Sequence, residues 1–183
     1  MTSSPSSRPL ADCQGALLAA VTDVAENSLF TFADASDEAA FEAAATASDT
    51  NSGWLRARIQ FTGPIGGQFT LTVPGALARR LCAAFAGADT SDDIGEDDLI
   101  DFTGELANMV CGAWLTRACQ HEAFDLTPPR VRRGGPGRAT GGKPGDADRV
   151  YLAIDDTPIR LEIDWGTAAP TAPRSVPEHA DAR

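Results

Sequence analysis

The stretch Glu96–His121, EDDLIDFTGELANMVCGAWLTRACQH, decides how the rest of the chain is organised. At about 100° of rotation per residue, its apolar side chains fall within one stripe about 100° wide, which predicts an amphipathic helix over Asp97–His121. The stripe consists of Leu99, Phe102, Leu106, Met109, Val110 and Ala113. We expect this stripe to be the buried side of the helix.

The opposite side of the same helix carries a short polar motif. Asp101, Glu105, Asn108 and Gly112 gather within about 60° of one another, so a carboxylate and a carboxamide point the same way beside a glycine. A glycine inside a helix costs about 1 kcal/mol relative to alanine, and one reason to keep it is close approach of a foreign surface. An ordinary solvated helix face has the same kind of composition, so the motif alone decides nothing.

The segment from Asp101 to Gly112 resembles the signature of the CheC/CheX/FliY family of response-regulator phosphatases. That signature is an acidic residue or serine, three residues, Glu, two residues, Asn, and a proline about twenty residues further on. Asp101, Glu105 and Asn108 match it, and the proline is Pro128 or Pro129. The flanking sequences GGQFTLTVPGALARRLCAAFAG and LTPPRVRRGG are similar to the single-site CheX branch, and the resemblance covers roughly residues 10–165.

The pattern of apolar and polar residues along the chain predicts one α/β domain. Trp54–Phe61 and Phe69–Val73 alternate between apolar and polar residues around a glycine-rich turn, which predicts an antiparallel hairpin. A second hairpin is predicted for residues 150–154 and 159–165, and a single strand is predicted for residues 124–133, entered through Pro128 and Pro129. The resemblance implies a pseudo-symmetric arrangement of helix, hairpin, helix, helix and hairpin, with a largely antiparallel central sheet flanked by helices.

The helices other than the organising one are expected in three places. Residues 10–28 form the first helix, and residues 33–52 form either a surface helix around Glu38–Ala45 or a connection. Pro74 opens the next helix, with its buried side formed by Leu77, Leu81 and Phe85. Outside the domain of residues 10–166 we expect disorder at residues 1–9 and 167–183, and a flexible loop at 134–148.

Composition excludes several classes of function. The 183 residues suffice for one core, and 43% hydrophobic residues exclude a wholly disordered chain. The net charge of −11 argues against non-specific nucleic-acid binding. A basic run does occur, interleaved with glycine and proline, and it is typical of a solvated loop rather than a docking patch. It comprises Arg130, Arg132, Arg133, Arg138 and Lys143.

The sequence offers few residues for metal sites or disulfides and no segment for membrane insertion. The four cysteines, Cys13, Cys82, Cys111 and Cys119, lack paired short spacing and are interpreted as reduced thiols that mostly fill the core. Only His121 and His179 offer imidazoles, so we expect no metal site and no histidine-based triad. Without a long apolar run or a signal peptide, we expect a cytoplasmic protein.

The resemblance implies an aspartyl-phosphate phosphatase acting on the receiver domain of a response regulator, which terminates a chemotaxis or two-component signal. It assigns to Asn108 the orientation of the attacking water and to Glu105 a salt bridge with the receiver's lysine. Asp101, Gly112 and Pro129 would contact the partner. The Mg²⁺ belongs to the receiver, and the chain needs no cofactor of its own.

Two other functions remain open: a non-catalytic module that binds a receiver or a flagellar-switch partner, and a purely structural dimer unit. Intact Glu105 and Asn108 favour the enzyme. The first helix repeats the acid and amide residues as Asp23, Glu26 and Asn27, but Glu26 and Asn27 are adjacent and project about 100° apart, so we expect no second site there.

We also expect a homodimer, which the resemblance implies. We expect the terminal hairpin to leave an apolar edge strand that pairing would protect, consisting of Ile159, Leu161 and Ile163. The alternative is a monomer in which the polar residues Arg160, Glu162 and Asp164 protect that edge.

Overall fold

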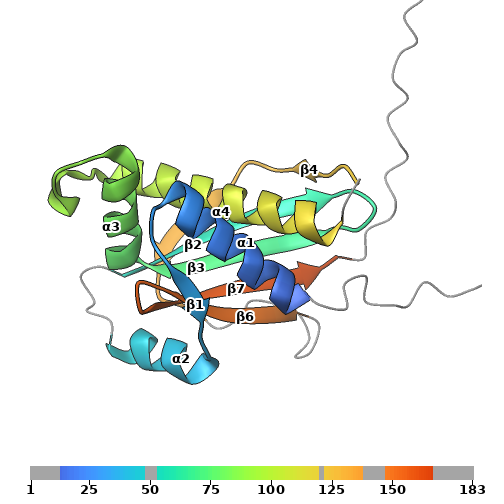
Figure 1. The fold of residues 1–183 in the computed structure, drawn as a ribbon, viewed down its shortest axis with the longest axis horizontal. Coiled ribbons are helices and arrows are strands. Elements are labelled where there is room, and N and C mark those ends of the chain that lie inside the picture. Colours follow the sequence, from blue (N-terminus) through green and yellow to red (C-terminus); the bar gives the residue numbers. More distant parts are fainter. Residues whose placement is uncertain (1–12, 48–52, 120–121, 138–146, 167–183) are drawn as a thin grey trace, which may run out of the picture.

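The computed structural model describes residues 13–47, 53–119, 122–137 and 147–166. The elements follow one another as α1 (Cys13–Ser28), β1 (Ala33–Ala35), α2 (Glu38–Ala47), β2 (Trp54–Thr62), β3 (Gly67–Pro74), α3 (Gly75–Ala86), η1 (Ser91–Asp93), α4 (Glu96–Ala118), β4 (Asp125–Leu126), β5 (Arg130–Gly134), β6 (Ala147–Ile154) and β7 (Thr157–Trp165). Figure 1 shows the strands as one sheet with helices on it.

Within the described ranges the sheet has seven strands, all paired antiparallel. Its order is β1-β6-β7-β3-β2-β4, and β5 also pairs with β2. The predicted hairpin of β2 and β3 forms with Leu55 opposite Val73 and Ile59 opposite Phe69. The predicted α/β class, with an antiparallel central sheet flanked by helices, is confirmed.

The side chains of the central strands alternate between two different faces of the sheet. One face is apolar and carries Leu55, Ala57, Ile59, Phe61, Phe69, Leu71, Val73, Ile159, Leu161 and Ile163, all buried. Helices α1 and α4 lie side by side across this inner face (Figure 1). The helices and the inner face together enclose the hydrophobic core.

Helix α4 is buried over a wider arc than the sequence predicted. Of the expected stripe, Leu99, Phe102, Leu106 and Val110 are buried, while Met109 and Ala113 are half-buried. Ala107, Cys111 and Trp114 are buried as well. The reason is that α4 contacts both the sheet and α1, so two sides of the helix are covered.

The opposite, outer face of the sheet is polar, and α2 covers part of it. Phe41 of α2 is fully buried there. Its ring lies 5.0 Å from the ring of Trp54 and 5.7 Å from that of Tyr151, and the Arg160 guanidinium lies 4.7 Å from the Phe41 ring centroid. The segment that the sequence left ambiguous therefore contains a short strand and a helix anchored by one phenylalanine.

The edge-strand argument for a dimer is wrong. Strand β7 pairs with β6 on one side and with β3 on the other, so Ile159, Leu161 and Ile163 do not lie at an edge. Arg160 and Glu162 do not protect an edge either, because they lie buried on the outer face. The homodimer itself stays a prediction.

The region after α4 also differs from expectation. The single strand expected over residues 124–133 is divided into β4 and β5, separated by residues 127–129. Arg130, Arg132 and Arg133 lie in β5, so the interpretation of the basic run as a loop is wrong for them, because this segment pairs with β2 along its length. Arg138, Lys143, most of the expected loop 134–148, and the segments 1–9 and 167–183 lie outside the described residues.

Candidate functional site

Helix α4 begins directly after Gly95 and ends at Ala118, where the Cys119 N–H donates a hydrogen bond to the Leu115 carbonyl at 2.9 Å. No side chain caps its start. Instead the first turn contains Glu96, Asp97 and Asp98, whose negative charges interact favourably with the positive end of the helix dipole. The acidic run thus has a structural role at the helix start.

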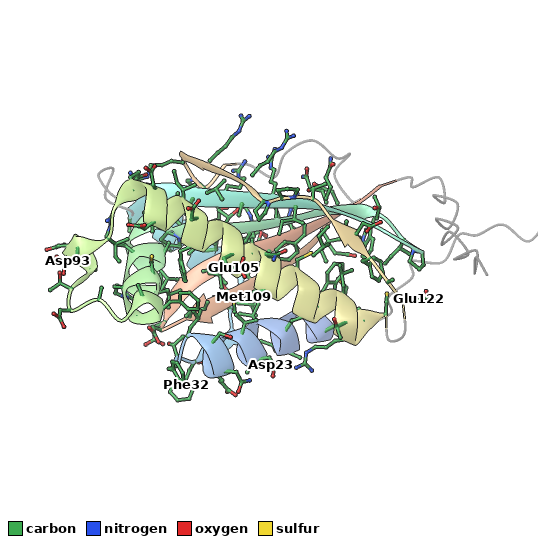
Figure 2. All side chains as sticks on the ribbon, turned by 90° about the horizontal axis from the view of Figure 1, so that it is seen from above. Asp23, Phe32, Asp93, Glu105, Met109 and Glu122 are labelled. Atoms are coloured by element: carbon green, nitrogen blue, oxygen red, sulfur yellow. The ribbon has the colours of Figure 1, made fainter. Side chains whose placement is uncertain are left out.

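The predicted motif lies together on the outward side of α4. Asp101 and Glu105 are exposed, and Asn108 and Gly112 are half-exposed. Leu106, next to Glu105, is only 3% exposed, so the helix buries its apolar side and exposes the motif as predicted. Figure 2 labels Glu105 and Met109 near the middle of α4.

The polar side chains of the motif are not engaged inside the protein. Within the described part of the chain, the side chains of Asp101, Glu105 and Asn108 make no hydrogen bond or ion pair. The backbone beneath them is held by burial of Leu106, Ala107 and neighbouring residues. A fixed helix therefore presents a carboxylate and a carboxamide with free hydrogen-bonding capacity.

The corresponding residues of α1 behave differently. Asn27 is exposed, but its amide donates hydrogen bonds to the Asp23 carbonyl at 3.0 Å and to the Asp23 carboxylate at 3.3 Å. Asp23 also forms a 2.7 Å ion pair with Arg117 of α4. The acid and amide of α1 thus bind neighbouring residues, whereas those of α4 have no such partner among the described residues.

Two glycines of α4 differ in what surrounds them. A Cβ on Gly112 would meet nothing within 4 Å, so no packing requirement inside the described chain explains this glycine. A Cβ on Gly104 would lie 3.3 Å from the Pro129 Cβ and 3.5 Å from Val131 Cγ2. Gly104, which the sequence reasoning missed, lets the segment before β5 lie close to α4.

Pro129 therefore flanks the motif. It is half-buried and contacts the turn of α4 that carries Gly104 and Glu105. The structure thus brings together all five predicted positions: Asp101, Glu105, Asn108 and Gly112 on one helix face, and Pro129 beside it. Pro128, the other candidate proline, is exposed.

An aromatic side chain flanks the motif from α3. The sequence placed Phe85 on the buried side of its helix, but 53% of it is exposed, so that assignment is wrong. Its ring lies 5.7 Å from that of Phe102, which is one turn before Glu105 and Leu106 on α4. Phe85 lies at the penultimate residue of α3, and the apolar spacing of the sequence does not show how far the neighbouring α4 covers that end of the helix.

The rest of the described chain offers no competing catalytic group. Burial raises the pKa of the Cys111 thiol to about 12, so it is protonated at neutral pH and is a poor nucleophile. Within the described ranges, no group of three or more His, Cys, Asp or Glu side chains is arranged to hold a metal ion. No helix in these ranges is both long enough and apolar enough to span a membrane.

The chemistry available at this surface is positioning. A carboxamide both donates and accepts hydrogen bonds, as holding a water molecule requires, and a carboxylate binds a cation. No histidine occurs within the described residues, so no Ser–His or Cys–His pair for nucleophilic catalysis forms there. An exposed helix face with these two groups therefore needs a second molecule to supply the rest of a reaction centre.

Comparison with known proteins gives one family and one fold. The sequence model of the family described as the chemotaxis phosphatase CheX matches residues 55–146. No curated protein matches the chain. Among solved structures, the chemotaxis protein CheX from Vibrio vulnificus is 18% identical with a TM-score of 0.66, over 88% of this chain and 100% of that one.

Two further structures share the fold. CheX from Desulfovibrio desulfuricans is 17% identical with a TM-score of 0.65, over 85% of this chain and 99% of that chain. A CheX from Borrelia burgdorferi, solved in complex with CheY, BeF₃ and Mg²⁺, is 14% identical with a TM-score of 0.56, over 82% of this chain and 96% of that chain.

Proposed function

The chain belongs to the family of the chemotaxis phosphatase CheX, and from this premise we propose that it hydrolyses the phospho-aspartate of a receiver domain. The observation that carries the proposal is the pairing of Glu105 with Asn108, both unengaged within the described chain, on one exposed face of a helix whose other sides are buried. Hydrolysis of this kind would end the signal that the phosphorylated receiver transmits.

Asn108 orients the water that attacks the phosphoryl group in line. Phosphoryl transfer depends mostly on positioning and on compensation of charge, so one well-placed carboxamide is a sufficient contribution from this side. The buried core of α4 supports that placement, since a rigid helix holds a side chain more precisely than a loop does.

Glu105 docks on a lysine of the receiver. It is an exposed carboxylate without an ion pair in the part of the chain that the structure describes, so it loses no interaction seen there when it binds a cation. The Mg²⁺ that compensates the phosphoryl charge is held by the receiver. The Borrelia CheX complex, which contains CheY and Mg²⁺, supports a partner of this kind.

The surroundings of the motif fit a protein partner. The open space over Gly112 allows another backbone to approach α4, while Pro129, just before β5, and Phe85 of α3 border the helix face. Exposed aromatic rings are common anchors in protein interfaces. The same surface also suits the alternative function, in which the chain binds a receiver without hydrolysing its phosphoryl group.

The decisive experiment measures the rate at which phosphorylated receiver domains of the same organism lose phosphate, with and without this protein. Asn108→Ala should slow the catalysed decay on the order of 10²-fold while leaving receiver binding intact. Asn27→Ala is the matched control, because it removes an exposed helical asparagine that already bonds to Asp23. Equal rates for the wild type and Asn108→Ala would refute catalysis and leave the binding module.

A further inference from the structure

Strand β5 places arginines opposite arginines. In the register of β2 and β5, Arg56 lies opposite Arg132, and Arg58 lies opposite Arg130. Arg56 and Arg58 alternate with the buried residues Leu55 and Ala57 of β2, and Arg130 and Arg132 lie directly opposite them, so all four belong to the outer face of the sheet, away from α4. Like charges directly opposite on neighbouring strands destabilise a sheet, and here two such pairs are adjacent.

The neighbouring carboxylates compensate this charge only in part. Glu162 already pairs with Arg149 at 3.4 Å and with Arg160 at 3.2 Å. Within the described residues, the exposed Arg130 and Arg132 make no ion pair or hydrogen bond. Arg56 donates a 2.8 Å hydrogen bond to the Pro136 carbonyl, which is a neutral acceptor.

The electrostatics of Arg56 show the same excess of positive charge. Its pKa is lowered first by burial and then by the charges of Arg58 and Arg160, while Glu162 raises it. Binding of an anion lowers the electrostatic free energy of a cation that is surrounded mainly by other cations. This local excess of positive charge contrasts with the net charge of −11 of the chain as a whole.

A groove of about 890 Å³ lies over these arginines. Besides these four arginines, Arg133 lines the groove, and it already pairs with Glu96 at 3.1 Å. Gln60 and Gln68 add carboxamides that donate and accept hydrogen bonds. In Figure 2, nitrogen-tipped side chains project from the sheet on the side away from α1 and α4. The volume lies within the usual range of sites for small organic ligands, about 300–1,000 Å³.

We propose that this groove binds a small molecule carrying two or more phosphate groups, of the nucleotide class. The planar fork of arginine matches phosphate oxygens in bidentate fashion. Residues two apart on a strand are separated by about 6.6 Å, so the two cross-strand pairs address a ligand with more than one anionic group. The acidic character of the chain as a whole disfavours a long nucleic acid, which would meet repulsion beyond the groove.

Pro129 borders both this groove and the α4 motif, but the four cross-strand arginines lie on the other face of the sheet from Glu105 and Asn108. Binding at these arginines can therefore be tested separately from the proposed phosphatase activity. Calorimetric titration of the full chain with ATP, pyrophosphate, adenosine, a decathymidylate and a hexaglutamate peptide tests it. ATP and pyrophosphate should bind, and adenosine should not. Tighter binding of decathymidylate or hexaglutamate than of ATP would overturn the proposal, as would no binding of ATP and pyrophosphate at millimolar concentration.

The double variant Arg130→Gln, Arg132→Gln keeps the fold, because both side chains are exposed and without partners among the described residues. It should weaken ATP binding about tenfold or more, since charge-assisted hydrogen bonds are lost. It should also raise the melting temperature without ligand, because the cross-strand repulsion is removed.

Arg80→Gln with Arg117→Gln changes the net charge equally but lies outside the groove, and it should leave ATP binding unchanged. Equal weakening by both double variants would show that only overall charge matters and would overturn the site.

Discussion

Pro129 lies against Gly104, where a Cβ added to the glycine would come within 3.3 Å of the Pro129 Cβ. This close approach places the segment before β5 along the side of α4, next to the turn that carries Glu105. Gly112, two turns further along the same helix, has open space above it. One glycine of α4 therefore serves internal packing, and the other leaves room on the surface.

The two glycines predict different responses to alanine. Gly112→Ala should stabilise the protein by about 1 kcal/mol, because alanine favours the helix and its methyl group meets nothing. Gly104→Ala should gain less, because Pro129 and Val131 must move to admit the methyl group. Urea unfolding of both variants measures the difference, and an equal or larger gain for Gly104→Ala would contradict the packing role.

Gly112→Ala should also have a cost in function. If a receiver approaches α4 at Gly112, the added methyl group lies in the interface and should raise the half-saturating receiver concentration about tenfold, equivalent to about 1.4 kcal/mol. Receiver titrations in the dephosphorylation assay measure this. A variant that is more stable and fully active would place the interface elsewhere.

The charge of Glu105 gives a separate prediction. Glu105→Gln keeps the shape of the side chain but removes the negative charge, so it should weaken receiver association about tenfold, equivalent to about 1.4 kcal/mol. The dependence of association on salt should become shallower, because an attractive charge pair is gone. Glu26→Gln, an exposed carboxylate of α1, is the control. Identical salt dependence in wild type and Glu105→Gln would contradict the salt bridge.

Because Phe41 anchors α2 to the outer face of the sheet, its replacement should strongly lower the stability of the protein. Phe41 is fully buried against Trp54 and Tyr151, so Phe41→Ala should reduce the free energy of unfolding by about 3–5 kcal/mol. Phe30, which is 88% exposed, is the matched control, and Phe30→Ala should change stability by less than about 0.5 kcal/mol. Similar effects of both changes in urea unfolding would show that α2 does not depend on Phe41.

The sequence was sufficient for the features that depend on local periodicity. The face of α4 that carries Glu105 and Asn108 follows from the rotation per residue, and the hairpin of β2 and β3 follows from alternation around a glycine turn. Both are properties of neighbouring residues, so no information about distant segments was needed. The spacing of Glu105 and Asn108, together with the family resemblance, identified the candidate site.

Features that depend on distant pairing were missed. The alternation of Ile159, Leu161 and Ile163 predicts a strand but does not indicate whether β7 lies at an edge or between β6 and β3. Which strands pair with β7 depends on the packing of the whole fold. The exposure of Phe85 likewise depends on where α3 ends relative to α4. The opposition of Arg56 and Arg132 appears only once the register of β2 and β5 is known.

The buried thiol of Cys111 predicts a pH dependence of stability. Burial raises its pKa from an ordinary value of 9.0 to about 12, so above pH 9 the thiol ionises in the unfolded chain but stays protonated in the folded one. Unfolding then releases a proton, and the free energy of unfolding falls as the pH rises from about 9 towards 12. For this group alone the loss between pH 8 and pH 10 is about 1.4 kcal/mol.

Comparison with a variant isolates Cys111 from other titrating groups, including Tyr151, whose pKa is also raised to about 12, mainly by burial. Cys111→Ala should be less stable than the wild type at pH 8 because it leaves a cavity, and the difference should shrink by about 1.4 kcal/mol at pH 10. Leu115→Ala creates a cavity in the same helix without removing a titrating group, so its difference from the wild type should stay constant. A constant difference for Cys111→Ala as well, measured by urea unfolding at both pH values, would show that Cys111 ionises in the folded protein.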